Sequence, residues 1–100
     1  MSRRTVDWND GLAKDLRNPR FAQEFIQAAL EDGLSIQAVL GKVIRAYGIK
    51  EFAAKVKMPS PNLLRAVNTR HNPTIETVNR LLRPFALELT VMPAGKRRVA

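Results

Sequence analysis

The chain has 100 residues, about the size of one domain, and its hydrophobic fraction of 45% and charged fraction of 26% are ordinary for a water-soluble protein. The absence of cysteine excludes disulfides and thiolate metal sites, and no apolar run approaches the roughly 18 residues of a membrane span. The N-terminal stretch lacks the apolar region of a secretory signal, so we expect a cytoplasmic protein with no membrane partner.

The net charge of +8 is divided unevenly along the chain. Residues 1–34 carry five basic and six acidic side chains, whereas residues 35–100 carry twelve basic and three acidic ones, a net of +9. A positive potential confined to one part of a domain attracts polyanions, with nucleic acid as the first candidate. A solvated basic surface that keeps the protein in solution is the alternative, and charge alone does not decide between them.

The first third of the chain predicts a short helix and a longer one. In residues 7–17, Leu12 and Leu16 stand four residues apart behind a start rich in Asp and Asn, which is typical of a short helix. Asn18-Pro19 then has the pattern of an N-cap followed by proline at the first helical position. Behind it one apolar stripe runs as far as Asp32-Gly33: Phe21, Ala22, Phe25, Ile26, Ala29 and Leu30.

The middle of the chain predicts a third helix and then a shorter fourth one. Ser35 can cap the third helix, and Gly48 suits the left-handed residue that ends it. The fourth helix is expected at about residues 50–57, with Phe52, Ala53 and Val56 facing inward.

A proline-rich break separates the fourth helix from a fifth. Met58-Pro59-Ser60-Pro61 interrupts the helical pattern, because proline lacks the amide proton and restricts the residue before it. We expect Ser60 as the N-cap and Pro61 as the first residue of a helix through Val67, with Leu63, Leu64 and Val67 as core contacts.

The last quarter of the chain predicts one more helix and then a strand. Thr74 can cap a helix that Pro84 helps to end, and its expected inner face is Ile75, Val78, Leu81, Leu82 and Phe85. From Ala86 to Met92 apolar and polar residues alternate, as in a half-buried strand. One strand cannot satisfy its own backbone groups, so pairing with a second copy in a symmetric dimer is a hypothesis.

These elements predict an all-α protein with three parts. Residues 1–17 form an arm with a short helix, and residues 18–92 form a five-helix domain with one C-terminal β-strand. Residues 93–100 are expected to be a disordered basic tail.

The two short helices at about residues 49–67 have the spacing of a helix-turn-helix. In this motif the first helix supports the second, whose N-terminal end enters the major groove of DNA. A small residue is needed where the helices cross, and Ala53 supplies it, ten residues before Leu63. The candidate DNA-binding residues on and around the second helix are Lys50, Ser60, Pro61, Asn62, Arg65, Asn68, Thr69 and Arg70.

These candidates divide by the contact that their chemistry allows. Arg65 can pair bidentately with guanine and Asn62 with adenine, although a phosphate contact for Arg65 and a bond within its own helix for Asn62 stay open. Ser60 is expected first as a cap and second as a DNA contact. The side chains expected to meet phosphates, which position a protein without reading sequence, are Lys50, Lys55, Lys57 and Arg70. RNA is disfavoured because the basic half lacks exposed aromatic residues for base stacking.

Catalytic chemistry has no support in the sequence. His71, the only histidine, lies in a polar loop without a second histidine or a cysteine to complete a metal site or a catalytic pair. No glycine-rich phosphate loop or nucleophile elbow occurs. We therefore expect no enzyme activity, no catalytic residue, no metal and no cofactor.

Residues 40–93 resemble the addiction-module antidote proteins, a branch of the Xre-like (lambda-repressor-like) helix-turn-helix class. The residues that carry the resemblance are Gly48-Ile49, Phe52-Ala53, Leu63 through Val67, Asn72-Pro73-Thr74, Thr77-Val78, Leu81-Leu82 and the alternating end from Leu87 to Val91. The helix from Phe21 to Asp32 is similar to the N-terminal helix of that family. The resemblance implies an antitoxin that binds double-stranded DNA as a homodimer, binds a RelE-like toxin and represses its own operon.

The chain departs from the family pattern at two positions in the turn. Lys57 stands where the family has glycine, and a lysine held at positive φ costs about 1 kcal/mol. Pro59 stands where it has serine, so the cap is expected to shift to Ser60 and the helix to begin one residue late. The alternative function is a protein-interaction module that neutralises a toxin without reading DNA, with Trp8, Leu12 and Leu16 as the partner-binding part.

Overall fold

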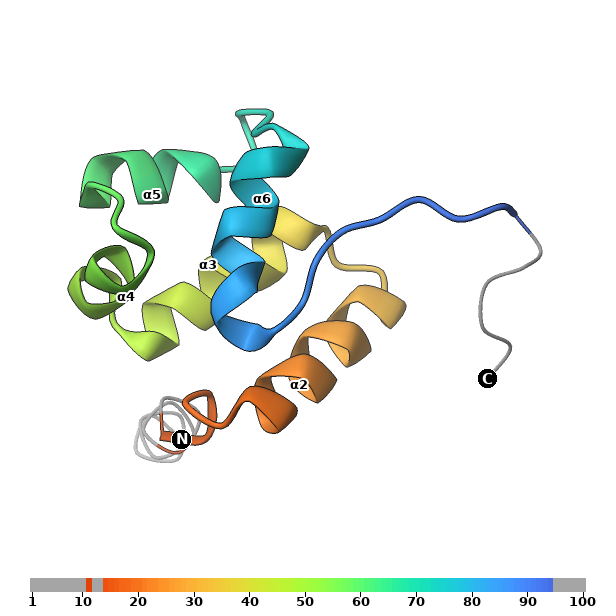
Figure 1. Ribbon diagram of the computed structural model, residues 1–100, viewed down its shortest axis with the longest axis horizontal. Coiled ribbons are helices and arrows are strands. Elements are labelled where there is room, and N and C mark those ends of the chain that lie inside the picture. The colour runs from red at the N-terminus through yellow and green to blue at the C-terminus, as the bar shows by residue number, and fades with distance from the viewer. Residues whose placement is uncertain (1–10, 12–13, 95–100) are drawn as a thin grey trace, which may run out of the picture.

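The computed structural model describes residue 11 and residues 14–94. Five complete α-helices and one 3-10 turn follow one another there (Figure 1): α2 (Pro19–Glu31), α3 (Ile36–Tyr47), α4 (Ile49–Val56), α5 (Ser60–Ala66), α6 (Ile75–Leu82) and η1 (Arg83–Phe85). The expected all-α class is confirmed for this part of the chain. None of the helices found there is both long and apolar enough to cross a membrane.

The helix boundaries follow the predicted capping residues closely. Asn18 Oδ1 accepts from the N–H of Arg20 at 3.0 Å, and Ser35 Oγ accepts from the N–H of Ala38 at 3.1 Å. The Thr74 hydroxyl caps α6 in the same way, by accepting from the N–H of Thr77 at 3.1 Å. Each bond satisfies one of the N–H groups that a helix start leaves without an intrahelical partner.

The helix predicted at residues 7–17 is described only in part. Gly11, Lys14 and Asp15 are helical, and the chain turns at Leu16 and Arg17. Leu16 is only 1% exposed and belongs to the hydrophobic core. Its proposed role as a partner contact is therefore wrong, because a side chain already packed in the core cannot also meet a second protein. Trp8 and Leu12 lie outside the described residues.

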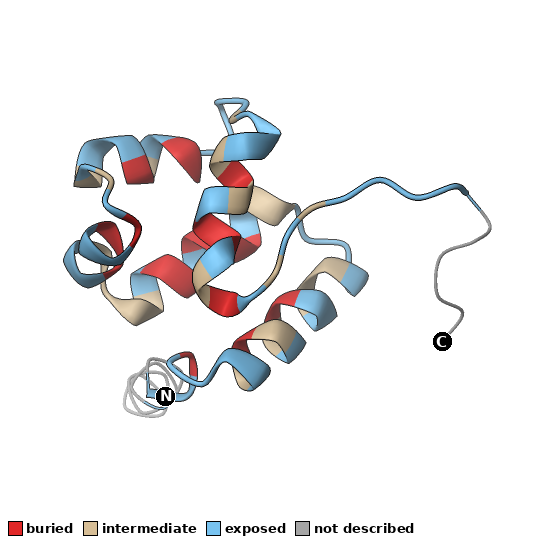
Figure 2. Ribbon diagram, in the orientation of Figure 1, coloured by how far each residue is buried: buried red, intermediate tan, exposed pale blue. Residues whose placement is uncertain are grey.

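The core is built around α3, which contacts both α2 and α4 (Figure 2). Four of its apolar side chains are almost completely buried: Val39, Leu40, Val43 and Ile44. At one end of α3 an aromatic group closes the core, since the rings of Phe52 and Phe85 stack at 5.7 Å and Tyr47 meets Phe52 edge-on at 5.3 Å. Burying one such side chain contributes roughly 1.5–3 kcal/mol, so this core is the main source of stability.

Two expectations for α6 need correction. Ile75 was assigned to the inner face but is 61% exposed, because the first turn of α6 extends past the buried part of the fold (Figure 2). The helix also ends at Leu82, before Phe85, and continues as the single 3-10 turn η1, which contains Pro84 and delivers Phe85 to the core. Ala86 then turns the chain in the left-handed conformation, at φ 59°.

The C-terminal segment leaves the helical body in an extended path (Figure 1). The strand expected at residues 86–92 is not formed, because no neighbouring strand offers its backbone groups to this segment within the described chain. Leu87 and Leu89 pack half-buried against the core, and the N–H of Leu89 donates to Asn79 Oδ1 at 2.6 Å. Beyond them Val91 is 89% exposed and Met92 52%. Residues 95–100, the greater part of the predicted basic tail, lie outside the described residues.

Candidate nucleic-acid interface

The turn between α4 and α5 is closed by backbone hydrogen bonds. The N–H of Met58 donates to the carbonyl of Ala53 at 2.9 Å, and the N–H of Lys57 donates to that of Ala54 at 3.3 Å. This pair of bonds forms a Schellman motif, which requires a left-handed residue after the helix. Lys57 is that residue, with φ 57° and ψ 51°, so the predicted positive φ at Lys57 is confirmed.

The start of α5 differs from the predicted one by one residue. Pro59, with φ −58° and ψ 142°, precedes the helix, and its carbonyl accepts the first helical bond from the N–H of Leu63 at 3.0 Å. Ser60 is therefore the first helical residue and not the N-cap, and no side chain caps α5. Pro61 at the second position is tolerated because that N–H would have no intrahelical partner in any case.

The two faces of α5 have different environments. Leu63 and Ala66 are buried against the rest of the fold, at 0% and 8% exposure. Pro61, Asn62 and Arg65 are exposed on the other face. The side chain of Asn62 makes no hydrogen bond within the described chain, so the bond inside its own helix that the sequence left open is not formed.

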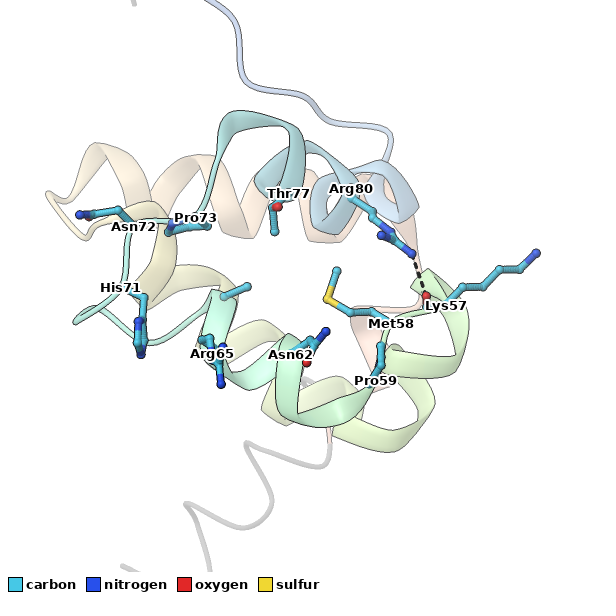
Figure 3. A pocket seen from close by; sticks show the side chains of 11 residues that line it. Lys57, Met58, Pro59, Asn62, Arg65, His71, Asn72, Pro73, Thr77 and Arg80 are labelled. Carbon is cyan, nitrogen blue, oxygen red and sulfur yellow. Dashed lines mark hydrogen bonds between the residues drawn. The ribbon is translucent and has the colours of Figure 1, made fainter.

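Arg80 of α6 holds the turn from outside. Its Nη2 donates to the carbonyl of Lys57 at 2.7 Å, as Figure 3 shows. Its Nε also donates to the carbonyl of Val56 at 3.2 Å. The guanidinium thereby satisfies two carbonyls at the end of α4 that have no helical partner. This role of Arg80 was not predicted from the sequence. No local signal reveals the contact, since the partners are 23 and 24 residues apart.

The loop after α5 is fixed in a similar way by Gln37 of α3. The Gln37 amide nitrogen donates to the carbonyls of Ala66, Asn68 and His71 at 3.3, 2.9 and 2.7 Å. Within the loop, Asn68 Oδ1 accepts from the N–H of Arg70 at 2.8 Å. Part of the Asn68 side chain is therefore committed to the shape of the loop, whereas the side chains of Thr69 and Arg70 are exposed. Gln37 was not among the predicted functional residues.

An open cleft of about 490 Å³ separates α5 from the loop at 71–73 and from α6 (Figure 3). Asn62 and Arg65 line it from α5, and Thr77 and Arg80 line it from α6. Its formally charged lining residues are Lys57, Arg65 and Arg80. A neighbouring hollow shares Lys57 and Arg80 and adds Lys55 and Arg83. All the formally charged side chains that line these two hollows are thus basic, which favours an anionic ligand.

The eight predicted DNA-binding residues occupy three places in the fold. Four of them lie on α5: Ser60, Pro61, Asn62 and Arg65. Asn68, Thr69 and Arg70 follow in the next loop, and Lys50 lies in the first turn of α4, at the opposite end of that helix from Lys57. Ser60 is half-buried and the other seven are exposed.

Comparison with protein families, with curated proteins and with solved structures finds no match for the chain. The resemblance to the addiction-module antidote proteins therefore stays a prediction.

Proposed function

We propose that the chain binds double-stranded DNA through a helix-turn-helix formed by α4 and α5, and that it reads sequence with α5. The observation that carries the proposal is the basic cleft beside the exposed face of α5, where Asn62 and Arg65 are exposed and every formally charged lining residue is positive. A duplex offers both of the matching groups, since base edges lie in a groove that is flanked by phosphates.

Each predicted residue then has a defined role in the complex. Arg65 pairs with the O6 and N7 of a guanine, and Asn62 pairs with the N6 and N7 of an adenine. Lys50 and Arg70, on either side of α5 in the chain, contact phosphates and set the orientation of the helix. The Schellman turn at Lys57 and the bonds from Arg80 support this arrangement, because they hold α5 at a fixed angle to α4.

The proposed DNA-binding unit is a homodimer in which residues 86–92 pair with the same segment of a second copy. The segment supports this idea by its extended path and by the exposure of Val91 at 89% and Met92 at 52%. The N–H of Leu89 already donates to Asn79, so pairing would satisfy the backbone groups beyond it, which have no partner strand among the described residues, and would cover both side chains. The two copies of α5 would then lie roughly 34–36 Å apart, or a multiple of it, to reach successive major grooves.

The resemblance adds the biological setting to this proposal. The protein would be a cytoplasmic antitoxin that represses its own operon and binds a RelE-like toxin. The alternative, an interaction module that neutralises a toxin without reading DNA, has lost one of its three expected contacts because Leu16 is buried. DNA binding is therefore the proposal to test first.

Fluorescence anisotropy tests the proposal directly. The protein is titrated into a labelled duplex from immediately upstream of its own gene and into a scrambled duplex of equal length, at two salt concentrations. We expect a preference for the native duplex of more than about a thousandfold. Equal and steeply salt-dependent binding to both duplexes would mean that the basic surface attracts only phosphates.

Three variants separate base readout from charge. We expect Arg65→Ala to weaken binding to the native duplex by about 5- to 150-fold and to relax specificity, and Lys50→Ala to weaken binding to both duplexes alike. Arg20→Ala is the matched control, because it removes the same charge from an exposed position on α2. If Arg65→Ala behaves like Arg20→Ala, Arg65 does not read a base.

A further inference from the structure

Gln37 connects α3 to the loop that follows α5 by donating to three backbone carbonyls. The side chain is half-buried in the first turn of α3. Its two amide hydrogens are shared among three carbonyls, and the two shortest distances, 2.7 and 2.9 Å, go to His71 and Asn68 in the loop. The third carbonyl, that of Ala66 at 3.3 Å, belongs to the last residue of α5.

The loop itself has little else to hold it. Residues 68–71 are all exposed, so apolar packing contributes little to their conformation. Two bonds within the loop shape it, from the N–H of Arg70 to Asn68 Oδ1 at 2.8 Å and from the N–H of His71 to the carbonyl of Asn68 at 2.9 Å. Those bonds close the turn, and the N–H of Asn68 donates to the carbonyl of Arg65 at 3.1 Å, which joins the start of the loop to α5. None of these bonds joins the loop to α3. Among the residues that the structure describes, Gln37 is the side chain from another element that hydrogen-bonds this loop.

The direction of these bonds also affects the potential of the loop. Because the carbonyls of Ala66, Asn68 and His71 accept from Gln37, their partially negative oxygens face α3. The exposed residues of the loop, 68–71, include Arg70, whose guanidinium is the formally charged group among them. An anion that approaches the end of α5 therefore meets a positive group and no competing carbonyl from this set.

We propose that Gln37 is a positioning residue for nucleic-acid binding, which holds the loop at residues 68–71 so that Arg70 meets a phosphate of the DNA backbone. The proposal rests on the proposed function, because it assigns the loop one part of the same DNA complex. Gln37 itself touches no DNA in this arrangement. Its loss releases the loop, so Arg70 samples many positions and its phosphate contact is lost.

The test compares Gln37→Met with Gln23→Met. Methionine keeps the length of the side chain and removes the donor. Gln23 is the matched control because its amide also donates to a distant carbonyl, that of Phe85 at 2.9 Å, in η1, which follows the opposite end of α6 from the loop. Anisotropy is measured on native and scrambled duplexes over a series of salt concentrations, at a temperature where thermal unfolding shows each variant to be folded.

We expect Gln37→Met to weaken binding to both duplexes by the same factor and to lower the slope of log K against log salt by about 1, the share of one phosphate contact. Gln23→Met should keep the wild-type slope even if it lowers the melting temperature. Gln37→Asn, whose amide is one methylene too short to reach all three carbonyls, should change the slope in the same direction and provides the test if Gln37→Met does not fold.

The outcomes distinguish this proposal from the one on which it rests. If the wild-type protein prefers the native duplex and Gln37→Met keeps the wild-type slope, the role of Gln37 is refuted and DNA binding stands. The same conclusion follows if Gln37→Met and Gln23→Met lower the slope equally. If the wild-type protein binds neither duplex, the proposed function fails and the role of Gln37 falls with it.

Discussion

Replacing Lys57 by glycine tests whether the turn between α4 and α5 stores strain. Lys57 has φ 57° and ψ 51°, a conformation in which a side-chain Cβ approaches the following carbonyl oxygen. Its side chain is exposed and makes no hydrogen bond or ion pair within the described chain. Its truncation therefore removes no contact that stabilises the fold, and the effect of Lys57→Gly is confined to the backbone.

The size of the effect follows from two opposing contributions. The left-handed conformation costs a residue with a Cβ roughly 1–2 kcal/mol, which glycine does not incur. Glycine also gives the unfolded chain more freedom, which costs the folded state about 0.5–1 kcal/mol. From the middle of each range, we expect Lys57→Gly to raise the free energy of unfolding by about 0.75 kcal/mol. At roughly 4–8 °C per kcal/mol for a domain of this size, the melting temperature rises by about 3–6 °C.

Thermal and urea unfolding, followed by far-UV circular dichroism, measure this change against two controls. Lys57→Ala removes the same charge but keeps Cβ, so it should change stability by less than about 0.5 kcal/mol. Lys55→Gly places glycine two residues earlier, inside α4, and should destabilise the protein by about 1 kcal/mol. If Lys57→Gly is no more stable than Lys57→Ala, strain at this turn is not a cost to the fold and the reasoning is refuted.

Three further substitutions probe the parts that position the interface, each measured by thermal unfolding. Gly41→Ala in α3 should stabilise by about 0.5–1 kcal/mol, since the new methyl meets the core side chain of Val67 at 3.8 Å and displaces only the flexible guanidinium of Arg45. Gly33→Ala, at φ 99°, should destabilise the protein, and stability changes of the same sign for both variants would contradict this reasoning. Arg80→Met should lower the free energy of unfolding by about 1–2 kcal/mol because two hydrogen bonds are lost, whereas Arg83→Met, which loses none, should be near neutral. Equal destabilisation by both variants would mean that the two bonds of Arg80 do not stabilise the turn. Leu16→Ala should lower the free energy of unfolding by about 2–5 kcal/mol. An unchanged melting temperature would mean that Leu16 is not packed in the core.

The parts of the fold that local sequence determines were predicted well. Asn18, Ser35 and Thr74 cap their helices as expected, because an N-cap depends on one side chain and the two or three residues after it. The left-handed Lys57 was predicted from the family resemblance, in which glycine stands at this turn position. Ser60 was misassigned because a serine before a proline has the pattern of a cap, whereas the chain starts the helix from the carbonyl of Pro59.

The parts that depend on distant contacts were not accessible to the same reasoning. Arg80 and Gln37 each donate hydrogen bonds to backbone carbonyls more than 20 residues away in the chain. No periodicity in the sequence predicts such a pair. Ile75 has the right spacing for the core, but its burial depends on where the neighbouring helices end. The alternation in residues 86–92 indicates a strand, yet a strand forms only where another is present, and one chain offers none among its described residues.

The hydrogen bond between Gln23 and Phe85 has a consequence for how the protein is made. It joins residues 62 positions apart, and the ring of Phe85 fills the end of the core against Phe52. The ribosome delivers the N-terminal helices first, but they cannot close this core until the 3-10 turn Arg83–Phe85 has been synthesised. A chain that terminates before this turn would expose apolar surface to proteases and chaperones, so only nearly complete copies would remain folded.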